Sequence, residues 1–203
     1  MESNVADSEP MVDIAAVAEP ELQDYLRQLE VIRRDAAALV AGLGAGQMKW
    51  RPEPGRWSIV ECFDHLNSVS AMYIPLFAER IADARAKGML AAGPFRYSFL
   101  GNKFVGSLEP PVKMKVKMPK GMEAPVLADP ATVLPEFDRL TVEMAKVMAS
   151  ADGVDLRGVK ISSAFSKVLR LSLGQWFAFV NAHTRRHLWQ ARNIMERPDF
   201  PKS

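Results

Sequence analysis

Hydrophobic residues recur every three or four positions in four separate stretches of the chain, and this spacing is typical of amphipathic helices. The stretches cover residues 20–43, 58–87, 137–148 and 172–196, with charged and amide side chains between the apolar positions. Pro75 lies inside the second stretch, where it is expected to kink or break the helix. The pattern therefore predicts four helices, one of them interrupted.

The helix starts are marked by capping residues. Ser58 with Glu61, and Ser172 with Gln175, form the S-x-x-E/Q pattern in which each side chain satisfies a free backbone N–H of the first turn. For the third helix we expect Thr132 as the N-cap, because this start would place Pro135 in the first turn, where a missing N–H costs no intrahelical hydrogen bond.

The segment 89–129, between the second and third helices, differs from the rest of the chain. It is rich in proline and glycine, and residues 112–118 alternate between apolar residues and lysine. A period of two predicts an extended strand, and we expect no helix in this segment. The predicted fold is an all-α four-helix bundle with a long crossover that contains a short extended segment.

Composition and charge fit a single globular domain. The chain has 203 residues, of which 48% are hydrophobic and 25% charged, with a net charge of +2 that gives no argument for nucleic acid. Residues 1–19 are acidic, unlike a leader peptide, and are expected to form a flexible tail before a domain at 20–198. The single cysteine and the lack of a long apolar run indicate a reducing, cytoplasmic location without membrane insertion.

The three histidines are the strongest chemical signal. His183 and His187 are four residues apart on the apolar stripe of the fourth helix, so both are expected to point into the bundle. His65 lies about two turns into the second helix. Three imidazoles from facing helices can bind one metal ion, although a lone histidine on an apolar face is more often a neutral core residue. The spacing alone favours neither interpretation.

Two groups of residues carry a resemblance to a known family: Pro54-Gly55-Arg56-Trp57-Ser58-Ile59 with Glu61 and His65-Leu66, and His183-Thr184-Arg185-Arg186-His187-Leu188 with Gln190. Through them the sequence resembles the DinB/YfiT-like superfamily of small metal-binding four-helix bundles, over about residues 22–197. This resemblance implies a divalent metal bound by His65, His183 and His187. It also implies an activity of one of two kinds, a hydrolase or a transferase or isomerase that uses a low-molecular-weight thiol such as bacillithiol or mycothiol.

A three-histidine site leaves a coordination position open, where a bound water or thiol would lose its proton near neutral pH. Zinc or nickel is expected first, with cobalt or iron as alternatives. Thr184 stands where a zinc peptidase of the H-E-x-x-H type needs its glutamate, so peptidase chemistry of that type is unsupported. A carboxylate-bridged di-iron site is excluded because no Glu-x-x-His motif precedes these histidines.

Five further residues are candidates for the surroundings of the metal. Cys62 is either a fourth ligand, a reactive thiol or, more commonly for a helical cysteine, a small buried residue. Glu61 and Asp64 could hydrogen-bond an imidazole, although the cap would occupy Glu61. Gln190 could line the pocket or merely pack, and Tyr97 belongs to the aromatic part of the crossover.

Three functions follow from these features. The first is a metal-dependent enzyme with a small-molecule substrate, and the second is a metal-binding or regulatory module without turnover. The third and weakest is an anion or nucleic-acid binder that uses the basic crossover, whose lysines are more simply explained as a solvated strand face. We expect the crossover either to cover the open side of the metal site or to pack against a second copy in a homodimer.

Overall fold

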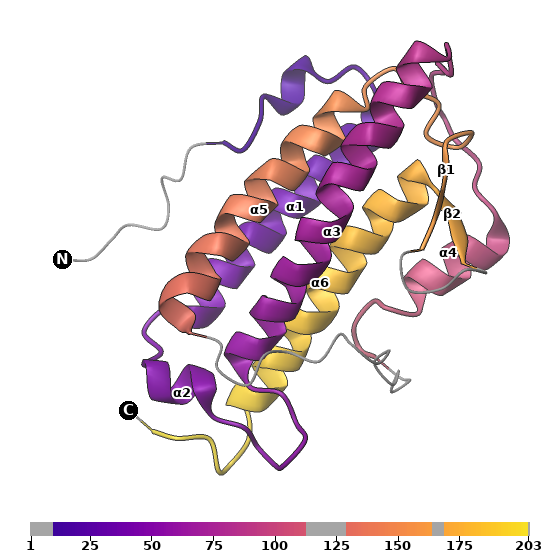
Figure 1. Ribbon diagram of the computed structural model, residues 1–203. Helices are drawn as coiled ribbons and strands as arrows, with labels where there is room; N and C mark the ends of the chain where they lie inside the picture. Colours follow the sequence, from indigo (N-terminus) through magenta and orange to yellow (C-terminus); the bar gives the residue numbers. More distant parts are fainter. Residues whose placement is uncertain (1–9, 113–128, 164–168, 203) are drawn as a thin grey trace.

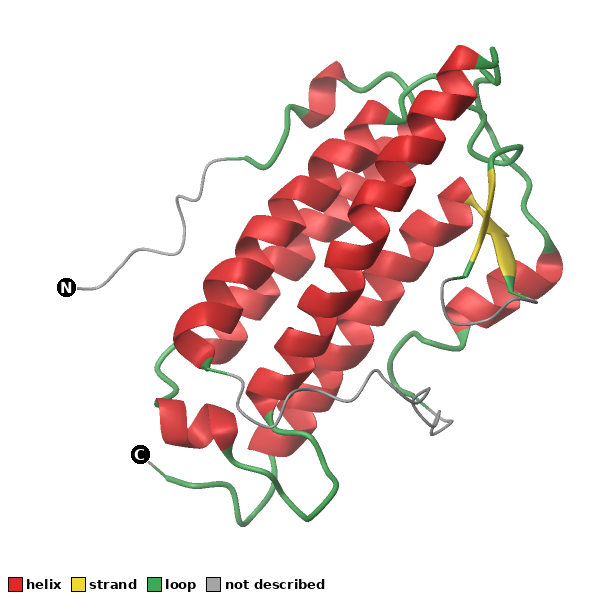
Figure 2. Cartoon of the chain, viewed as in Figure 1, coloured by secondary structure: helices red, strands yellow, loops and turns green. Residues whose placement is uncertain are grey.

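The computed structural model describes residues 10–112, 129–163 and 169–202, and these form a four-helix bundle with a small hairpin at one side (Figures 1 and 2). The long helices are α1 (Pro20–Val40), α3 (Ile59–Ala86), α5 (Pro130–Ser150) and α6 (Leu173–Met195). The short ones are η2 (Ile14–Ala16), α2 (Ala45–Lys49) and α4 (Phe99–Gly106). Strands β1 (Lys160–Ser162) and β2 (Arg170–Ser172) pair antiparallel, with Ile161 opposite Leu171.

The four long helices are arranged as a square. Helix α1 packs against α5 and α6, and α3 packs against the same two helices, so α1 and α3 are diagonal. Helices α3 and α5 run parallel: Lys49 pairs with Asp129 near the start of both, and Arg85 donates to the carbonyls of Ser150 and Asp152 near the end of both. A parallel neighbour can be reached only by returning along the bundle, which explains the length of the crossover.

The predicted four-helix bundle is confirmed, and so are both capping boxes. Glu61 Oε2 accepts from the Ser58 amide at 2.7 Å, and Gln175 Oε1 accepts from the Ser172 amide at 3.3 Å. Backbone carbonyls of Val159 and Leu156 accept from the first two amides of α6, so few of its N-terminal N–H groups are left free.

Two expectations about the long helices are corrected by the structure. Helix α3 is continuous through Pro75, because Pro75 and Ala71 are exposed and the carbonyl that loses its partner faces water. Helix α5 begins at Asp129 rather than Thr132: the Asp129 carboxylate accepts from the Ala131 amide, and Pro130 takes the first helical position.

The crossover contains a helix where none was expected. Helix α4 is capped by Ser98, whose Oγ accepts from the Gly101 amide at 3.2 Å. It docks on α6 because Gln175 Nε2 donates to the Ser98 carbonyl and to Asn102 Oδ1. These contacts are tertiary and leave no periodic signal in the sequence. The alternating run at 112–118 lies almost entirely outside the described residues, so its extended conformation stays a prediction.

The packed domain also begins earlier than Pro20. Met11 and Val17 are buried, and the amides of Ala18 and Glu19 donate to the Asp152 carboxylate at 2.8 and 2.9 Å. Residues 11–19 therefore pack against the bundle, because two apolar side chains and two backbone amides find partners there. Residues 1–9 of the expected tail lie outside the described part of the chain.

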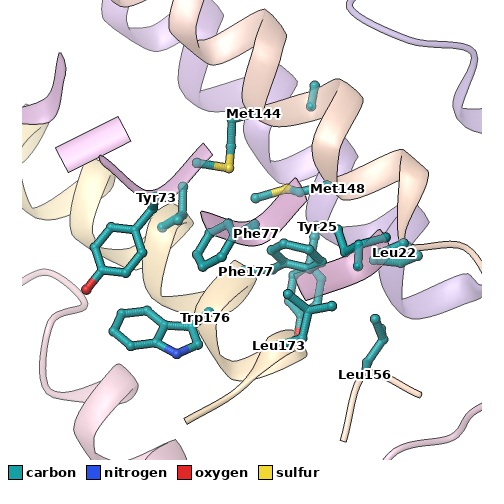
Figure 3. Packing of buried hydrophobic residues seen from close by; sticks show 14 of the residues in the cluster. Leu22, Tyr25, Tyr73, Phe77, Met144, Met148, Leu156, Leu173, Trp176 and Phe177 are labelled. Carbon is teal, nitrogen blue, oxygen red and sulfur yellow. The ribbon is translucent and has the colours of Figure 1, made fainter. Parts of the chain in front are cut away.

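The core is divided into two hydrophobic clusters along the bundle. The larger lies toward the hairpin and is built around Phe77, Trp176 and Phe177 (Figure 3). The smaller surrounds Phe63 and Leu188 near the start of α3 and the end of α6. The three histidines lie between these clusters, on the parts of α3 and α6 where the two apolar surfaces meet.

Candidate metal centre

Two neighbouring helices bring the three histidines together. The cap at Ser58 fixes the start of α3, which places His65 in its second turn facing α6. His183 and His187 are one turn apart in the middle of α6, so both reach the same side of that helix. The inward orientation expected from the apolar stripe is therefore observed.

The imidazole nitrogens have the spacing of ligands around a single ion. His65 Nε2 lies 3.3 Å from His183 Nε2, and His187 Nε2 lies 3.2 Å from the same atom. All three ligand atoms lie within 4.8 Å of one another. Nitrogens bound at about 2.0–2.1 Å to a tetrahedral ion are about 3.3–3.4 Å apart. The three residues could therefore hold one metal ion without large movement.

Burial keeps these imidazoles neutral. It lowers the pKa of His65 to about 4, and together with the nearby His65 and Arg186 it lowers the pKa of His183 to about 3. Burial and the neighbouring histidines also bring the pKa of His187 well below its ordinary value. A neutral imidazole offers a lone pair, so the protonation state that a metal requires is already present at neutral pH.

Aromatic rings hold the imidazoles in place. Trp57 stacks on His187 with ring centroids 5.5 Å apart and an interplanar angle of 19°, and it also contacts His65 at 5.1 Å. Phe179 stacks on His183 at 5.2 Å and 10°, and Phe104 of α4 stacks on Phe179 at 6.0 Å and 7°. Phe179 was not expected at the site, although its position one turn before His183 was an available signal.

Glu61 serves the helix start and not an imidazole. Its carboxylate accepts from Ser58 and from Arg51, with Arg51 Nε at 2.9 Å from Glu61 Oε2. Burial alone would raise the pKa of Glu61, but the hydrogen bonds from Arg51 and Ser58 outweigh burial and hold the pKa below its ordinary value. The carboxylate is therefore an ionised structural group.

Cys62 and Asp64 lie between Glu61 and His65 in the sequence but do not join the histidine cluster. Cys62 is buried in the smaller hydrophobic cluster, and this burial, followed by the Glu61 charge, raises the pKa of its thiol. The interpretation of Cys62 as a small core residue is thus favoured over a ligand or a reactive thiol. Asp64 Oδ2 is enclosed without a hydrogen-bond partner among the described residues, and burial raises the pKa of this carboxyl group.

Of the two remaining candidates, Gln190 lies next to a histidine of the cluster and Tyr97 does not. Gln190 lies beside His187, and its side chain offsets part of the pKa decrease that burial causes there. Tyr97, in contrast, packs against Gly174, where an added Cβ would lie only 2.0 Å from the phenol oxygen. Gly174 is nine residues before His183, about 13 Å along the helix axis. Tyr97 is therefore held near the start of α6 by the α4 docking contacts and does not line the site.

The chain also matches known proteins over the part that carries this site. A profile of the DinB superfamily matches residues 28–191, which include all three histidines. An uncharacterized protein, YuaE of Bacillus subtilis, is 24% identical over 163 residues, covering 77% of this chain and 88% of the relative. The comparison with solved structures gave no match. None of the helices in the described ranges has the length and apolar character needed to cross a membrane. Fold, histidine spacing and profile agree, and the chain belongs to the DinB superfamily.

Proposed function

We propose that the protein binds one divalent metal ion through His65, His183 and His187 and is a metal-dependent enzyme acting on a small molecule. The observation that carries this proposal is the convergence of three neutral imidazole nitrogens, 3.2 and 3.3 Å apart, between two hydrophobic clusters. Zinc fits three imidazole ligands with one open position, which is the arrangement of catalytic zinc sites. Nickel, cobalt and iron remain alternatives.

The donor set determines the chemistry. Three neutral ligands leave the charge of the ion uncompensated, so a bound ion would lower the pKa of a water or a low-molecular-weight thiol in its open position. The protein contributes an aromatic surrounding, with Trp57 stacked on His187 and Phe179 stacked on His183. The activity classes that fit are hydrolysis and thiol transfer. Thr184 donates its hydroxyl to the Val180 carbonyl, so it does not replace the glutamate base of a peptidase.

Whether a small molecule can reach the three histidines distinguishes an enzyme from a metal-binding module without turnover. His65 and His187 are buried and His183 is of intermediate burial, so we infer that a small molecule would approach the cluster past His183. A fully enclosed cluster would have favoured the non-catalytic module. No observation favours the third candidate function, binding of an anion or a nucleic acid through the crossover. Four of the lysines on which it depends, Lys113, Lys115, Lys117 and Lys120, lie outside the described residues.

Cobalt substitution tests the proposal, because the visible spectrum of Co²⁺ reports its ligands. Tag-free protein is loaded with Co²⁺ and titrated with 2-mercaptoethanol, and separately with base. We expect both titrations to change the spectrum of the wild type, while the His183→Ala/His187→Ala variant binds no tightly held cobalt. An Arg192→Gln variant is the control, since Arg192 is an exposed α6 residue that pairs with Asp35. A cobalt spectrum that responds to neither thiol nor pH would show a closed site and contradict the enzyme proposal.

A further inference from the structure

Residues 156–195 contain seven arginines and lysines but no aspartate or glutamate. Three of these cations lie on or just before the β1–β2 hairpin, which stands at one side of the bundle (Figure 1). They are Arg157, Lys160 and Arg170, and all three are exposed. The hairpin therefore gathers positive charge in a stretch of chain that supplies no negative charge of its own.

The pairing of the strands places two of these cations on one face of the hairpin. Arg170 lies opposite Ser162, and Ser162 is two residues after Lys160 on the same strand. Residues directly opposite each other, and residues two apart along a strand, have side chains on the same face. Lys160 and Arg170 are therefore diagonal neighbours, about 7–8 Å apart, and the exposed Ser162 lies beside both.

Arg157 adds a third cation just before the hairpin, three residues before Lys160. The Asp155 carboxylate accepts from the amides of Arg157 and Gly158, at 3.0 and 2.8 Å, and so holds this turn. Burial lowers the pKa of Lys160, and the charges of Arg157 and Arg170 lower it further. The opposing effect of Asp155 is smaller. The three cations therefore act on one another, and the Asp155 carboxylate does not neutralise them.

These cations also lack the ion pairs that other basic residues form. Arg192, for example, pairs with Asp35. Within the described ranges, no carboxylate forms an ion pair with Arg157, Lys160 or Arg170. Like charges held together on one face repel each other, so an anion placed between them removes that repulsion.

The hairpin is a rigid support for this group of cations. Ile161 and Leu171 point to the opposite face, where each is 2% exposed in the larger hydrophobic cluster. The indole Nε1 of Trp176 donates to the Ile161 carbonyl at 3.0 Å, and β2 runs directly into α6. Because the backbone is already ordered, a ligand on this face pays little entropy for arranging it.

We propose that this face of the hairpin binds the phosphate group of a small soluble molecule through Arg157, Lys160 and Arg170. A phosphate monoester carries a charge of about −1.5 to −2 at neutral pH, which suits several cations better than the single charge of a carboxylate. The forked guanidinium donates parallel hydrogen bonds to phosphate oxygens, and the Ser162 hydroxyl is a further donor on the same face. None of the exposed large apolar side chains in the described chain lies on the hairpin, which disfavours a lipid surface as the source of the phosphate.

The proposed phosphate site is separate from the metal centre and does not depend on the proposed function. Ser172, at the end of the hairpin, is eleven residues before His183, about 16 Å along α6. Isotope-labelled full-length protein without added metal is therefore titrated with inorganic phosphate, and amide resonances are followed by NMR. Chloride at the same ionic strength is the blank. We expect saturable shifts at residues 157–162 and 170–172 with phosphate and none with chloride.

Charge-removing variants test the residues. Arg170→Gln and Lys160→Gln each remove one hydrogen-bonding cation and should weaken phosphate binding about tenfold. Arg34→Gln is the matched control, because Arg34 is exposed on α1 beside Asp35, which pairs with Arg192 in the last turns of α6. It should keep the wild-type affinity. The amide spectrum also shows whether each variant is folded, and two independent substitutions keep the test decisive if one is not.

A second arm of the experiment separates a soluble molecule from a lipid headgroup. Protein is sedimented with phosphatidylcholine vesicles that contain or lack phosphatidate, and we expect none to sediment with either. Sedimentation with phosphatidate that Arg170→Gln abolishes would overturn the assignment to a soluble molecule. Phosphate shifts that do not saturate, that map away from the hairpin, or that keep the wild-type affinity in both Arg170→Gln and Lys160→Gln would overturn the site itself.

Discussion

Metal binding is expected to stabilise the bundle, because the ion would join α3 to α6 and would bind only the folded arrangement of the three histidines. At a free metal concentration about a hundredfold above the dissociation constant, the expected gain in the free energy of unfolding is about 2.7 kcal/mol. For a chain of this size, 1 kcal/mol corresponds to roughly 2–4 °C, so the melting temperature should rise by roughly 5–11 °C.

The assay is thermal unfolding followed by circular dichroism, with and without Zn²⁺ for each variant. Comparing the shift within one variant removes the effect of any packing lost by the substitution itself. His65→Ala removes the only ligand from α3 and should abolish most of the shift, although the pair on α6 is retained. The reasoning is refuted if His65→Ala keeps the whole shift, because the ion then does not bridge the helices.

Three further predictions follow from the structure. Metal-free protein should be most stable above pH 6.5 and lose stability as the pH falls toward 4. The reason is that the pKa values of His65 and His183 are lowered to about 4 and about 3 in the folded protein, so the unfolded chain takes up protons first. Urea unfolding across this range measures how the free energy of unfolding changes with pH. Gly101→Ala should destabilise the protein by about 1–3 kcal/mol in urea unfolding, since its Cβ would lie 2.2 Å from Gln175 Nε2 and break the α4 docking contacts. Phe77→Ala should cost about 3–5 kcal/mol in the same assay, because Phe77 is fully buried in the larger cluster, and a loss below 1 kcal/mol would contradict that packing.

The long helices were predictable because their signals are local. The capping boxes at Ser58 and Ser172 and the apolar stripes depend only on residues within a few turns, so α3 and α6 were placed to within one or two residues. Helix α4 was missed because its stability comes from Gln175, more than seventy residues away. The β1–β2 hairpin is similarly supported from α6, where Trp176 Nε1 donates to the Ile161 carbonyl at 3.0 Å.

The candidate site was predictable in its ligands and not in its surroundings. His183 and His187 share a helical face, so their convergence follows from spacing alone, and the resemblance to a family strengthened the assignment of His65 as the third ligand. Tyr97 was misplaced because residues of a long crossover have no fixed phase relative to the bundle. The contacts of Trp57 with His65 and His187 depend on how the loop before α3 meets the cluster, which no local pattern specifies.

The most direct measurement is the metal content of protein purified without a metal-binding tag, equilibrated with Zn²⁺ and freed of unbound metal. Elemental analysis should find about one zinc per wild-type chain, since three converging imidazoles form one site. The His183→Ala/His187→Ala variant should contain almost none, and Arg192→Gln should match the wild type. A double variant that still carries about one zinc per chain would contradict the three-histidine site.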